Sequence, residues 1–492
     1  VNDIVIPVND QKGARLPVST FMGDRTDGTF PQGTAAYEKR GIAVDVPTWN
    51  PDNCIQCGFC SYVCPHAVVR LYAMTEEEAA NAPAGTKTAP MTGMPDKKFA
   101  IGISVLDCTG CGVCAATCPG KKGEKALTMQ PLEGEMPQQA VYNFLFDMPE
   151  KPEVLEKFKE NTIKGSQFHQ PLLEFSGACA GCGETPYAKL VTQLYGDRMY
   201  ISNATGCSSI WANAEYGYGM FLAQDTIRKA AIRKVEALAA KVEGDDKAVF
   251  DAYLNSIDCG ATNRSAADAL VKVLEGYAAN GCEESKEILD SKDYLAKKSI
   301  WIFGGDGWAY DIGFGGLDHV IASRQDVNIL VFDTEVYSNT GGQSSKSTPT
   351  GAIAQFAAAG KEVKKKDLAA IAMSYGYVYT AQVSMGADRN QCLKAFLEAE
   401  SYHGPSLIIA YAPCINHGIK GGMVHAQDEE KKAVDAGYWH LFRFDPRLAD
   451  EGKNPFHQGS HHVLQRLHHE RSPLQRPGPV QPGPCGRAVC KR

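Results

Sequence analysis

The stretch SIWIFGGDGWAYDIG, residues 299–313, decides the fold of the larger part of the chain. A short apolar strand leads directly into a Gly–Asp–Gly turn. Such a turn lets the backbone approach a phosphate, while Asp306 offers a carboxylate to a hard cation. Three further apolar strands, at residues 198–204, 327–334 and 406–413, alternate with helical stretches. This alternation predicts an α/β domain with a parallel sheet and helices on both of its faces.

Composition divides the 492 residues into five segments. An Ala-, Lys- and Glu-rich stretch at 221–296 predicts a helical insertion within the α/β domain. The last 36 residues hold five of the 12 histidines and a dense run of prolines. We interpret this abrupt change as a frameshifted reading rather than as a metal-binding tract. The segments are a connecting arm (1–48), a cysteine-rich domain (49–130), a linker (131–170), the α/β domain (171–456) and an atypical tail (457–492).

Charge, hydropathy and cysteine usage narrow the classes of function. The net charge of −7 argues against nucleic acid as the main partner. No apolar run approaches the roughly 18 residues that a membrane span needs. Eight of the 17 cysteines lie between Cys54 and Cys118, which favours metal sites in a reducing cytoplasm over a secreted disulfide scaffold. The first residues resemble neither a signal peptide nor a natural start, so we expect a longer parent protein.

Two cysteine runs, CIQCGFCSYVCP at 54–65 and CTGCGVCAATCP at 108–119, share one spacing. Both follow C-x₂-C-x₂-C-x₃-C-P, the bacterial ferredoxin pattern for [4Fe–4S] clusters, in which the fourth cysteine ligates the other cluster. A pair of Cys₄ zinc sites is the alternative, but the repeated arrangement with both prolines favours clusters. We therefore predict an α+β ferredoxin-like domain. Its clusters are held by Cys54, Cys57, Cys60 and Cys118, and by Cys64, Cys108, Cys111 and Cys114.

A further C-x-x-C pair, Cys179 and Cys182, lies in SGACAGCGETPY and has no second half nearby. Cys207 and Cys414 each follow a predicted strand. Because the carboxyl ends of parallel strands meet at one edge of a sheet, we expect these four cysteines to meet there. Zinc satisfies the ligand count, but the two clusters upstream favour a third [4Fe–4S] cluster.

Asn339 lies 33 residues after Asp306, at the end of the next predicted strand. Gly–Asp–Gly alone is a weak signal, since it also occurs in purely structural turns. With the following Asn, it resembles the thiamine diphosphate fingerprint, in which Mg²⁺ joins the diphosphate to the protein. The resemblance implies Asp306, the Thr334 side chain and the Val336 carbonyl as Mg²⁺ ligands, with Asn339 at the diphosphate or metal.

Longer motifs make the resemblance specific. The stretches GACAGCGETPY, ATGCSSIW, GDGWAYDIGFGGLDH, DTEVYSNTGGQSSKSTPTGA and APCINHG follow a two-cluster module. Together they resemble the C-terminal part of the pyruvate:ferredoxin (flavodoxin) oxidoreductase family, over residues 30–456. The resemblance implies thiamine diphosphate, Mg²⁺ and three [4Fe–4S] clusters, the proximal one held by Cys179, Cys182, Cys207 and Cys414. Residues implied to contact thiamine diphosphate are Glu184, Cys207, Gly305, Asp306, Gly307, Trp308, Thr334, Glu335, Val336, Tyr337, Ser338 and Asn339.

The resemblance also implies an activity. It is the oxidative decarboxylation of pyruvate with coenzyme A to acetyl-CoA and CO₂, with electrons passed through three clusters to ferredoxin or flavodoxin. In the family, N-terminal domains supply the activating glutamate and position pyruvate and coenzyme A, so we expect the catalytic glutamate outside this chain. We also expect a homodimer in the cytoplasm. The alternatives are a synthase for another 2-oxoacid and a non-catalytic electron-transfer protein.

Several residues near these motifs have less specific patterns. Cys259, Cys282 and Cys392 lack metal-site spacing, and we expect incidental thiols. We expect His66 to be a surface residue rather than one that tunes a cluster. His417, beside Cys414, has a functional and a structural interpretation with equal support. The charged run EVKKKD at 362–367 predicts a solvated face rather than a docking site.

Overall fold

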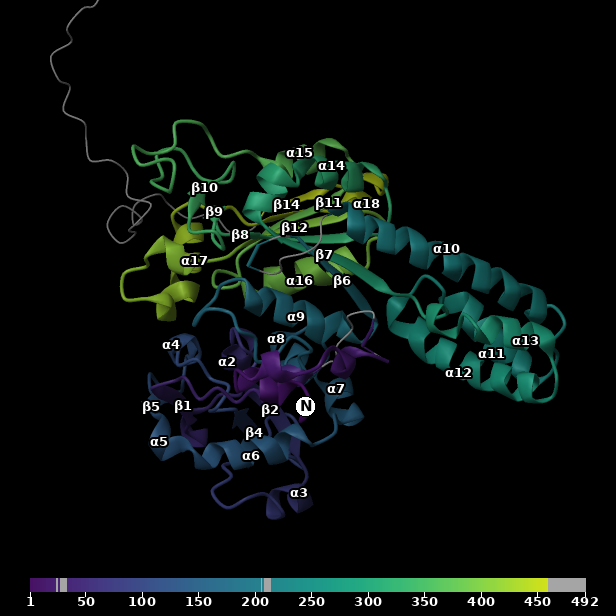
Figure 1. Ribbon diagram of the computed structural model, residues 1–492, viewed down its shortest axis with the longest axis horizontal. Coiled ribbons are helices and arrows are strands. Elements are labelled where there is room, and N and C mark those ends of the chain that lie inside the picture. Colours follow the sequence, from purple (N-terminus) through teal and green to yellow (C-terminus); the bar gives the residue numbers. More distant parts are fainter. Residues whose placement is uncertain (24, 27–32, 205, 208–213, 459–492) are drawn as a thin grey trace, which may run out of the picture.

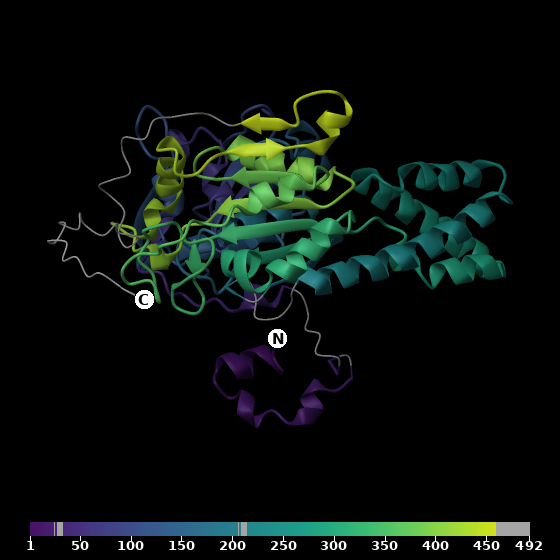
Figure 2. The same ribbon diagram turned by 90° about the horizontal axis from the view of Figure 1, so that it is seen from above.

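The computed structural model describes the chain except residues 24, 27–32, 205, 208–213 and 459–492. The predicted frameshifted tail therefore lies outside the described residues from 459 onward. Figure 1 shows a sheet domain above a smaller cysteine-rich domain, with a helical arm that projects to one side. Figure 2 shows the segment before residue 24, which contains α1 (Val5–Asn9), lying apart from these bodies. No helix in the described part of the chain is long and apolar enough to cross a membrane.

The α/β domain is built on a mixed sheet that is mostly parallel, as predicted. Within the described residues the strand order is β14-β13-β11-β12-β8-β7-β6. The second strand of this order, at one edge, pairs antiparallel with both of its neighbours, and the last five strands are mutually parallel. The parallel strands are β6 (Met199–Asn203), β7 (Ser299–Gly305), β8 (Asn328–Asp333), β11 (Tyr379–Val383) and β12 (Ser406–Tyr411). The edge strands are β13 (Phe442–Phe444) and β14 (Phe456–Gln458).

Helices cover both faces of this sheet. Trp301 of β7 packs with α9 and α16 in one core, and its neighbour Ile302 packs with α14 and α15 in the other. Because successive side chains of a strand point to opposite faces, a strand covered on both sides needs a continuous apolar run. This explains the run SIWIF. The helices are α9 (Thr185–Tyr195), α14 (Phe314–Ala322), α15 (Leu368–Ser374), α16 (Arg389–Glu400), α17 (Ala426–Asp435) and α18 (Pro446–Asp450).

The helical insertion is confirmed. Among the described residues between β6 and β7, four helices project from the sheet domain (Figure 1). They bury a separate apolar core in which Val235, Phe250, Leu270 and Leu274 are fully buried. The helices are α10 (Ala214–Ala239), α11 (Asp245–Ser256), α12 (Gly260–Ala279) and α13 (Glu283–Leu289).

The cysteine-rich domain contains two small antiparallel sheets and a short helix after each cysteine turn. Gly58 and Gly112 occupy the same position before these helices, with positive φ angles of 79° and 74°. Only glycine adopts this left-handed conformation at no cost, so the two runs form the same turn. The helices are α2 (Phe59–Tyr62), α3 (Glu76–Ala80) and α4 (Val113–Thr117). The strands are β1 (Asp45–Trp49), β2 (Val69–Met74), β3 (Ala89–Pro90), β4 (Lys98–Ile103) and β5 (Leu127–Pro131).

Residues 131–170, predicted as a linker, form helices that pack against the protein. Tyr142 and Leu145 of α6 are almost completely buried against the cysteine-rich domain. The prolines misled the prediction: Pro137 and Pro152 begin helices, where the missing N–H of proline is harmless. The helices are α5 (Leu132–Glu135), α6 (Pro137–Phe146), α7 (Pro152–Lys157) and α8 (Ile163–Ser166).

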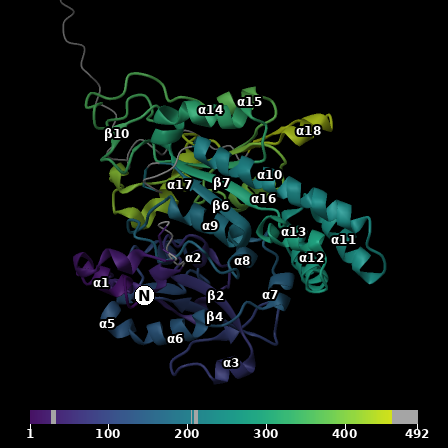
Figure 3. The same ribbon diagram turned by 45° about the vertical axis from the view of Figure 1, so that its right-hand side comes forward.

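The two domains share one hydrophobic core. Tyr62 and Val113 of the cysteine-rich domain pack in the same cluster as Tyr187 and Leu190 of α9. The Tyr62 hydroxyl also donates a hydrogen bond of 3.3 Å to the carbonyl of Arg389. Figure 3 shows α9 above α2, with α8 beside them. The cysteine-rich domain is therefore docked against the helical layer below the sheet.

Candidate active site

The carboxyl ends of the parallel strands bring the predicted site residues to one edge of the sheet. Gly305 at the end of β7 aligns with Phe332 of β8, and Asp333 aligns with Tyr411 of β12. The loops that follow these strands therefore leave the sheet side by side. They carry Asp306, Thr334 and Cys414.

Two of the spacings among the three predicted Mg²⁺ ligands are close to those that an octahedral magnesium ion requires. The Thr334 hydroxyl is 2.8 Å from Asp306 Oδ1 and 3.1 Å from the Val336 carbonyl oxygen. With Mg–O bonds of about 2.0–2.1 Å, adjacent ligands of an octahedron stand about 2.9 Å apart. These residues therefore fit the metal.

Hydroxyl groups hold the second oxygen of Asp306. Ser345 donates to Asp306 Oδ2 at 2.8 Å, and Ser347 donates to the same oxygen. Burial raises the pKa of Asp306 to about 7, and the neighbouring Asp333 adds to the rise, whereas the hydroxyl donors oppose it. A divalent cation beside the carboxylate would supply the missing positive charge. The sequence prediction omitted both serines, although they lie in the motif QSSKST.

A buried ion network involves the loop that directly follows β8 and carries Thr334, Glu335 and Val336, which we call the metal loop. Lys365 Nζ is 2.7 Å from Asp333 and 3.5 Å from Glu335, and both carboxylates are buried. Tyr438 donates to Glu335 at 2.7 Å. Glu335 has a φ angle of 63°, a strained conformation for a residue with a side chain. The Glu335 side chain therefore faces this network, and the solvated face predicted for 362–367 is wrong at Lys365.

A cavity of about 460 Å³ opens beside the metal loop. Its size is in the range of cofactor pockets. Its apolar wall includes Phe303, Phe332 and Ile415, and the predicted site residues on its wall are Cys179, Cys182, Glu184, Cys207, Asn339 and Cys414.

Of the predicted cofactor residues other than Cys207 and Asn339, only Glu184 lines the cavity. Glu184 is 7% exposed, and burial, with a further contribution from Asp306, raises its pKa to about 8. Tyr337 packs so closely over Gly307 that a Cβ there would lie 2.4 Å from its ring. Trp308 is buried in the sheet core. The remaining members, Gly305 and Ser338, flank Asp306 and Asn339.

His417 connects the cysteine loop to the metal loop. Its Nε2 atom is 2.6 Å from the Thr334 carbonyl oxygen, and its Nδ1 atom accepts a hydrogen bond from the Cys414 amide at 3.2 Å. The structure therefore favours a positioning role for this histidine.

The eight cysteines of the two runs gather in two neighbouring groups. Burial raises the pKa of Cys60, with further contributions from Cys57, Cys54 and Cys118. Burial likewise raises the pKa of Cys114, with Cys111, Cys64 and Cys108 adding to it. Each group thus combines three cysteines of one run with the fourth cysteine of the other. This grouping is compatible with the crossed ligation that the spacing predicts, which stays a prediction.

The four cysteines of the third predicted site line one cavity. Burial raises the pKa of Cys207 to about 12, and Glu184, Cys414 and Cys179 contribute. Within the described ranges, no group of three or more Cys, His, Asp or Glu side chains is arranged to hold a single metal ion. Four thiolates around one zinc would approach to about 3.8 Å, given Zn–S bonds of about 2.3 Å. A multi-atom cluster needs a wider cage.

The third cysteine group touches the cysteine-rich domain. Burial raises the pKa of the Cys111 thiol to about 11, and the backbone of Gly181, between Cys179 and Cys182, lies close enough to this thiol to oppose the rise. His66 Nδ1 lies 3.1 Å from the Ser176 carbonyl oxygen. His66 is only 2% exposed, so the predicted surface position is wrong. It is covered because the segment before Cys179 folds back over it, with the Phe175 amide donating to the His66 carbonyl at 2.9 Å.

The remaining cysteines that the structure describes lie outside these groups, as predicted. Cys259 is exposed, Cys282 is partly exposed and Cys392 is buried in the core shared by the two domains.

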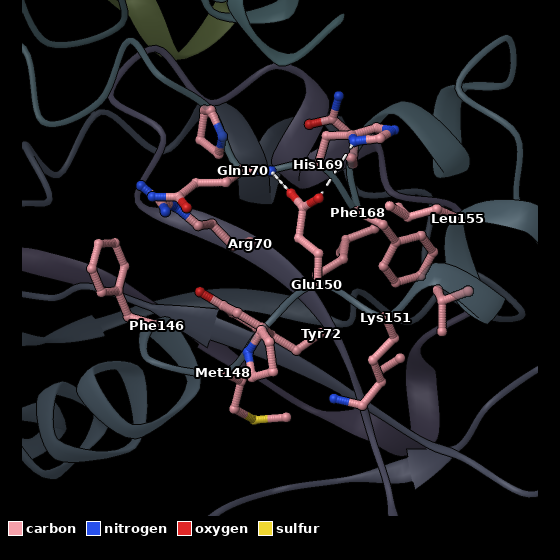
Figure 4. A pocket seen from close by; sticks show the side chains of 16 residues that line it. Arg70, Tyr72, Phe146, Met148, Glu150, Lys151, Leu155, Phe168, His169 and Gln170 are labelled. Atoms are coloured by element: carbon pink, nitrogen blue, oxygen red, sulfur yellow. Dashed lines mark hydrogen bonds and ion pairs between the residues drawn. The ribbon is translucent and has the colours of Figure 1, made fainter. Parts of the chain in front are cut away.

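A second cavity, of about 160 Å³, lies where α7 and residues 146–151 meet β2. Figure 4 shows Glu150 in it, within reach of His169 and Gln170. Glu150 accepts from the Gln170 amide at 2.6 Å and lies 3.8 Å from His169. Arg70 and Lys151 of its lining pair with Glu174 and Glu78. The charged side chains of this cavity are paired, so it offers no group for a ligand.

Three family models match separate parts of the chain. Residues 53–122 match a 4Fe-4S dicluster domain. Residues 287–410 match the C-terminal TPP-binding domain of thiamine pyrophosphate enzymes. Residues 1–43 match a model named EKR, a domain of unknown function. The first two matches confirm the predicted ferredoxin-like and thiamine diphosphate-binding domains.

Curated relatives match nearly the whole chain. The pyruvate:ferredoxin oxidoreductase of Moorella thermoacetica is 55% identical over 93% of this chain. The pyruvate-flavodoxin oxidoreductase of Enterobacter agglomerans is 52% identical over the same share. The chain corresponds to the C-terminal region of the pyruvate:ferredoxin/flavodoxin oxidoreductases. The family resemblance drawn from the motifs is thereby confirmed.

The chain spans about 41% of the length of these two oxidoreductases. A third relative, the mitochondrial pyruvate dehydrogenase [NADP(+)] of Euglena gracilis, is 45% identical over 95% of this chain, which covers 27% of that relative. The oxidoreductase region therefore occurs within longer chains, and the name of one of them specifies NADP(+) rather than ferredoxin or flavodoxin.

Proposed function

We propose that this chain is the cluster-bearing and diphosphate-binding part of an enzyme that oxidises pyruvate. In the reaction, pyruvate and coenzyme A give acetyl-CoA, CO₂, one proton and two electrons, and the electrons pass to ferredoxin or flavodoxin. One observation carries the proposal. The Asp306–Thr334–Val336 metal site and the four cysteines of the third group lie at the same sheet edge, on either side of Glu184.

Each part of the sheet edge has a defined role in this reaction. Bound thiamine diphosphate supplies the electron sink for the loss of CO₂. Asp306, Thr334 and the Val336 carbonyl hold Mg²⁺, and the serines on Asp306 orient its carboxylate. Asn339 faces the cavity and binds the diphosphate. The activating glutamate and the sites for pyruvate and coenzyme A belong to other parts of the enzyme.

The cysteines form an electron path of three [4Fe–4S] clusters. We assign Cys179, Cys182, Cys207 and Cys414 to the cluster next to the cofactor. The Gly181 backbone lies close to Cys111, so Cys64, Cys108, Cys111 and Cys114 would hold the neighbouring cluster and would supply the next electron carrier. The cluster of Cys54, Cys57, Cys60 and Cys118 follows, and the exposed side chain of Ile55 marks where this cluster approaches the surface.

The cellular setting follows from the same chemistry. All 15 cysteines of the described residues are free thiols, which suits a reducing cytoplasm. We further propose a homodimer, which rests on the family resemblance and which analytical ultracentrifugation can test.

The cluster count is the first test. The chain, purified without oxygen, is expected to hold about twelve irons and about twelve sulfides, four of each per cluster. A count of about eight would remove the third cluster, and zinc in place of iron would contradict the electron path. Cys259→Ser is the matched control, because this exposed thiol lies outside all three groups; it should leave the count unchanged.

The cofactor site is tested by binding. Thiamine diphosphate should bind only with Mg²⁺, and Asp306→Asn should weaken binding about 100-fold because it removes a charged metal ligand. Titration calorimetry measures this directly, and Asp428→Asn, at an exposed position, is the control. Equal affinity of Asp306→Asn and the parent chain would refute the site. Pyruvate-dependent dye reduction after adding the missing domains tests the substrate.

A further inference from the structure

Lys189 is a buried charge that the proposed reaction does not use. It lies on α9, its residue is 1% exposed, and no carboxylate in the described part of the chain pairs with it. Its ammonium donates instead to the carbonyls of Ser61 and Tyr62, the latter at 3.0 Å, and reaches Gln167 Oε1 at 3.4 Å. An unpaired ammonium is costly in a protein interior, so a compensating negative charge is expected nearby.

The carbonyl groups that accept hydrogen bonds from Lys189 lie between cysteines that we assign to two different clusters. Ser61 and Tyr62 are the last residues of α2, with Cys60 before them and Cys64 shortly after. Cys60 belongs to the first cysteine group and Cys64 to the second. Burial lowers the pKa of Lys189 to about 8, and both of these thiols oppose the fall. The ammonium therefore stands between the two cluster sites.

Two other cations lie beside the first group. Lys164 interacts with Cys54 and Cys57, and the Arg389 guanidinium stacks 4.6 Å from the ring centre of Phe59. Their strongest interactions with cysteines are with the first group: Lys164 with Cys54 and Cys57, and Arg389 with Cys57. Lys189 interacts with both groups from full burial, where water and salt screen its charge least.

A fixed positive charge changes the energy of an electron on a nearby cluster. A cluster held by four thiolates is negatively charged, and each electron it accepts makes it more so. A cation in a low-dielectric interior therefore stabilises the reduced cluster more than the oxidised one. We propose that Lys189 raises the reduction potentials of both clusters in the cysteine-rich domain. This role requires the ligation proposed above for those two clusters.

Helix α9 connects this charge to the cofactor site. The helix begins at Thr185, directly after Cys182 and Glu184, and carries Lys189 one turn later. Its N-terminal end therefore adjoins the third cluster, and its next turn enters the neighbouring domain. Helix α9 thus begins beside the proposed third cluster, which would donate electrons, and carries Lys189, whose charge would make the two clusters of the cysteine-rich domain better electron acceptors.

Gln167→Glu is the sharpest test, because it adds a carboxylate 3.4 Å from the ammonium and leaves Lys189 in place. The whole chain, loaded with clusters, is titrated with dithionite as the electron donor and followed by electron paramagnetic resonance. At a fixed applied potential, the ratio of reduced to oxidised cluster should fall about tenfold in both ferredoxin-type clusters. This fall corresponds to a decrease of about 59 mV in the reduction potential of a one-electron couple. The third cluster should shift less.

Three further variants serve as comparisons for Gln167→Glu. Gln170→Glu makes the same change at an exposed position and should shift each ratio by less than about twofold, because water screens it. Lys189→Met should shift both clusters in the same direction as Gln167→Glu, and Lys189→Arg, which keeps the charge, should not. Unchanged ratios in loaded Gln167→Glu overturn the role of Lys189 even if Lys189→Met fails to fold. Missing iron in the parent chain would instead refute the proposed ligation.

Discussion

The two kinds of cysteine site in this molecule are built in opposite ways. In the cysteine-rich domain, each run of four cysteines spans 11 residues and forms one turn that enters a short helix. At the sheet edge, the four cysteines come from three segments, and 232 residues separate Cys182 from Cys414. The first site depends on its own turns. The second depends on a whole sheet that brings distant loops together.

The cysteines of the two kinds of site also differ in how deeply they are buried. Cys60, Cys64, Cys114 and Cys118 belong to the hydrophobic core of their domain. Cys179 and Cys207 are exposed on the wall of a cavity. A cluster bound in the first region would fill part of the core, so the metal would stabilise the fold. In the second region the sheet is complete without the metal, so the fold provides the metal site.

The largest expected effect separates the two sites directly. Cys60→Ser should lose the clusters of its domain, about eight irons, and lower the thermal midpoint of that domain by roughly 10 °C or more. Cys414→Ser should lose only about four irons and leave both thermal midpoints nearly unchanged. Iron analysis with scanning calorimetry measures both quantities.

The opposite result would break the comparison. If Cys414→Ser unfolded the α/β domain, the third cluster would be a structural part of the sheet. If Cys60→Ser kept its midpoint, apolar packing alone would hold the cysteine-rich domain. Cys392→Ser, at a buried thiol outside the groups, controls for the cost of burying a hydroxyl.

A smaller effect is expected at the ion network beneath the metal loop. Lys365→Met leaves the carboxylates of Asp333 and Glu335 buried without their cation. Burial lowers the pKa of Lys365, but the two carboxylates raise it by more. Removing one partner of such a pair costs a few kcal/mol, and about 2 kcal/mol is reasonable for a lysine side chain that is one-quarter exposed. Urea unfolding of the loaded chain measures the loss.

A double variant identifies the cause of that loss. Asp333→Asn combined with Lys365→Met removes the ammonium and its nearer carboxylate, leaves only Glu335 charged, and should recover more than half of the stability. Lys364→Met, at an exposed neighbour, should change nothing measurable. A double variant no more stable than Lys365→Met alone would show that packing of the lysine stem, rather than its charge, supports the loop.

The sequence was most informative where the chemistry is local. The ferredoxin spacing predicted the two clusters, because two-residue spacers leave a chain few ways to arrange its sulfurs. Apolar strands ending in Gly–Asp–Gly predicted the parallel sheet and the edge where ligands gather. The prolines of 131–170 were misread, because their position within a helix, rather than their presence, decides whether they break it.

Contacts between distant segments were beyond sequence reasoning. Nothing around His66 indicates that residues 173–179 cover it. Lys189 lies in an ordinary amphipathic pattern, and only the docking of α9 on α2 shows that its ammonium enters the neighbouring domain. Lys365 belongs to a charged run, EVKKKD, that usually faces solvent. Each of these side chains obtains its role from a partner more than 25 positions away.

The smallest effect is a pH dependence at Glu430, whose partners also come from distant segments. Glu430 Oε2 accepts from Tyr187 of α9, from Ser384 and from the Gly386 amide. Burial raises its pKa from 4.5 to about 7, although these donors oppose the rise. Between about pH 4.5 and pH 7 the folded chain therefore keeps a proton that the unfolded chain has lost, and stability falls as pH increases.

Glu430→Gln removes this ionisation. It bears on the comparison between the two regions because the partners of Glu430, like the cysteines at the sheet edge, come together only when the sheet domain folds. The variant should gain stability relative to the parent between pH 5 and pH 8, by about 1–3 kcal/mol. The neighbouring Gln427 suits a neutral side chain at position 430. Its Oε1 atom is buried without a hydrogen-bond partner, and after the amide flips this atom can accept a hydrogen bond from position 430. Thermal unfolding at the two pH values measures the gain, with exposed Glu451→Gln as control. A constant difference between variant and parent would mean that the three donors keep Glu430 ionised, so that hydrogen bonding across the sheet outweighs burial.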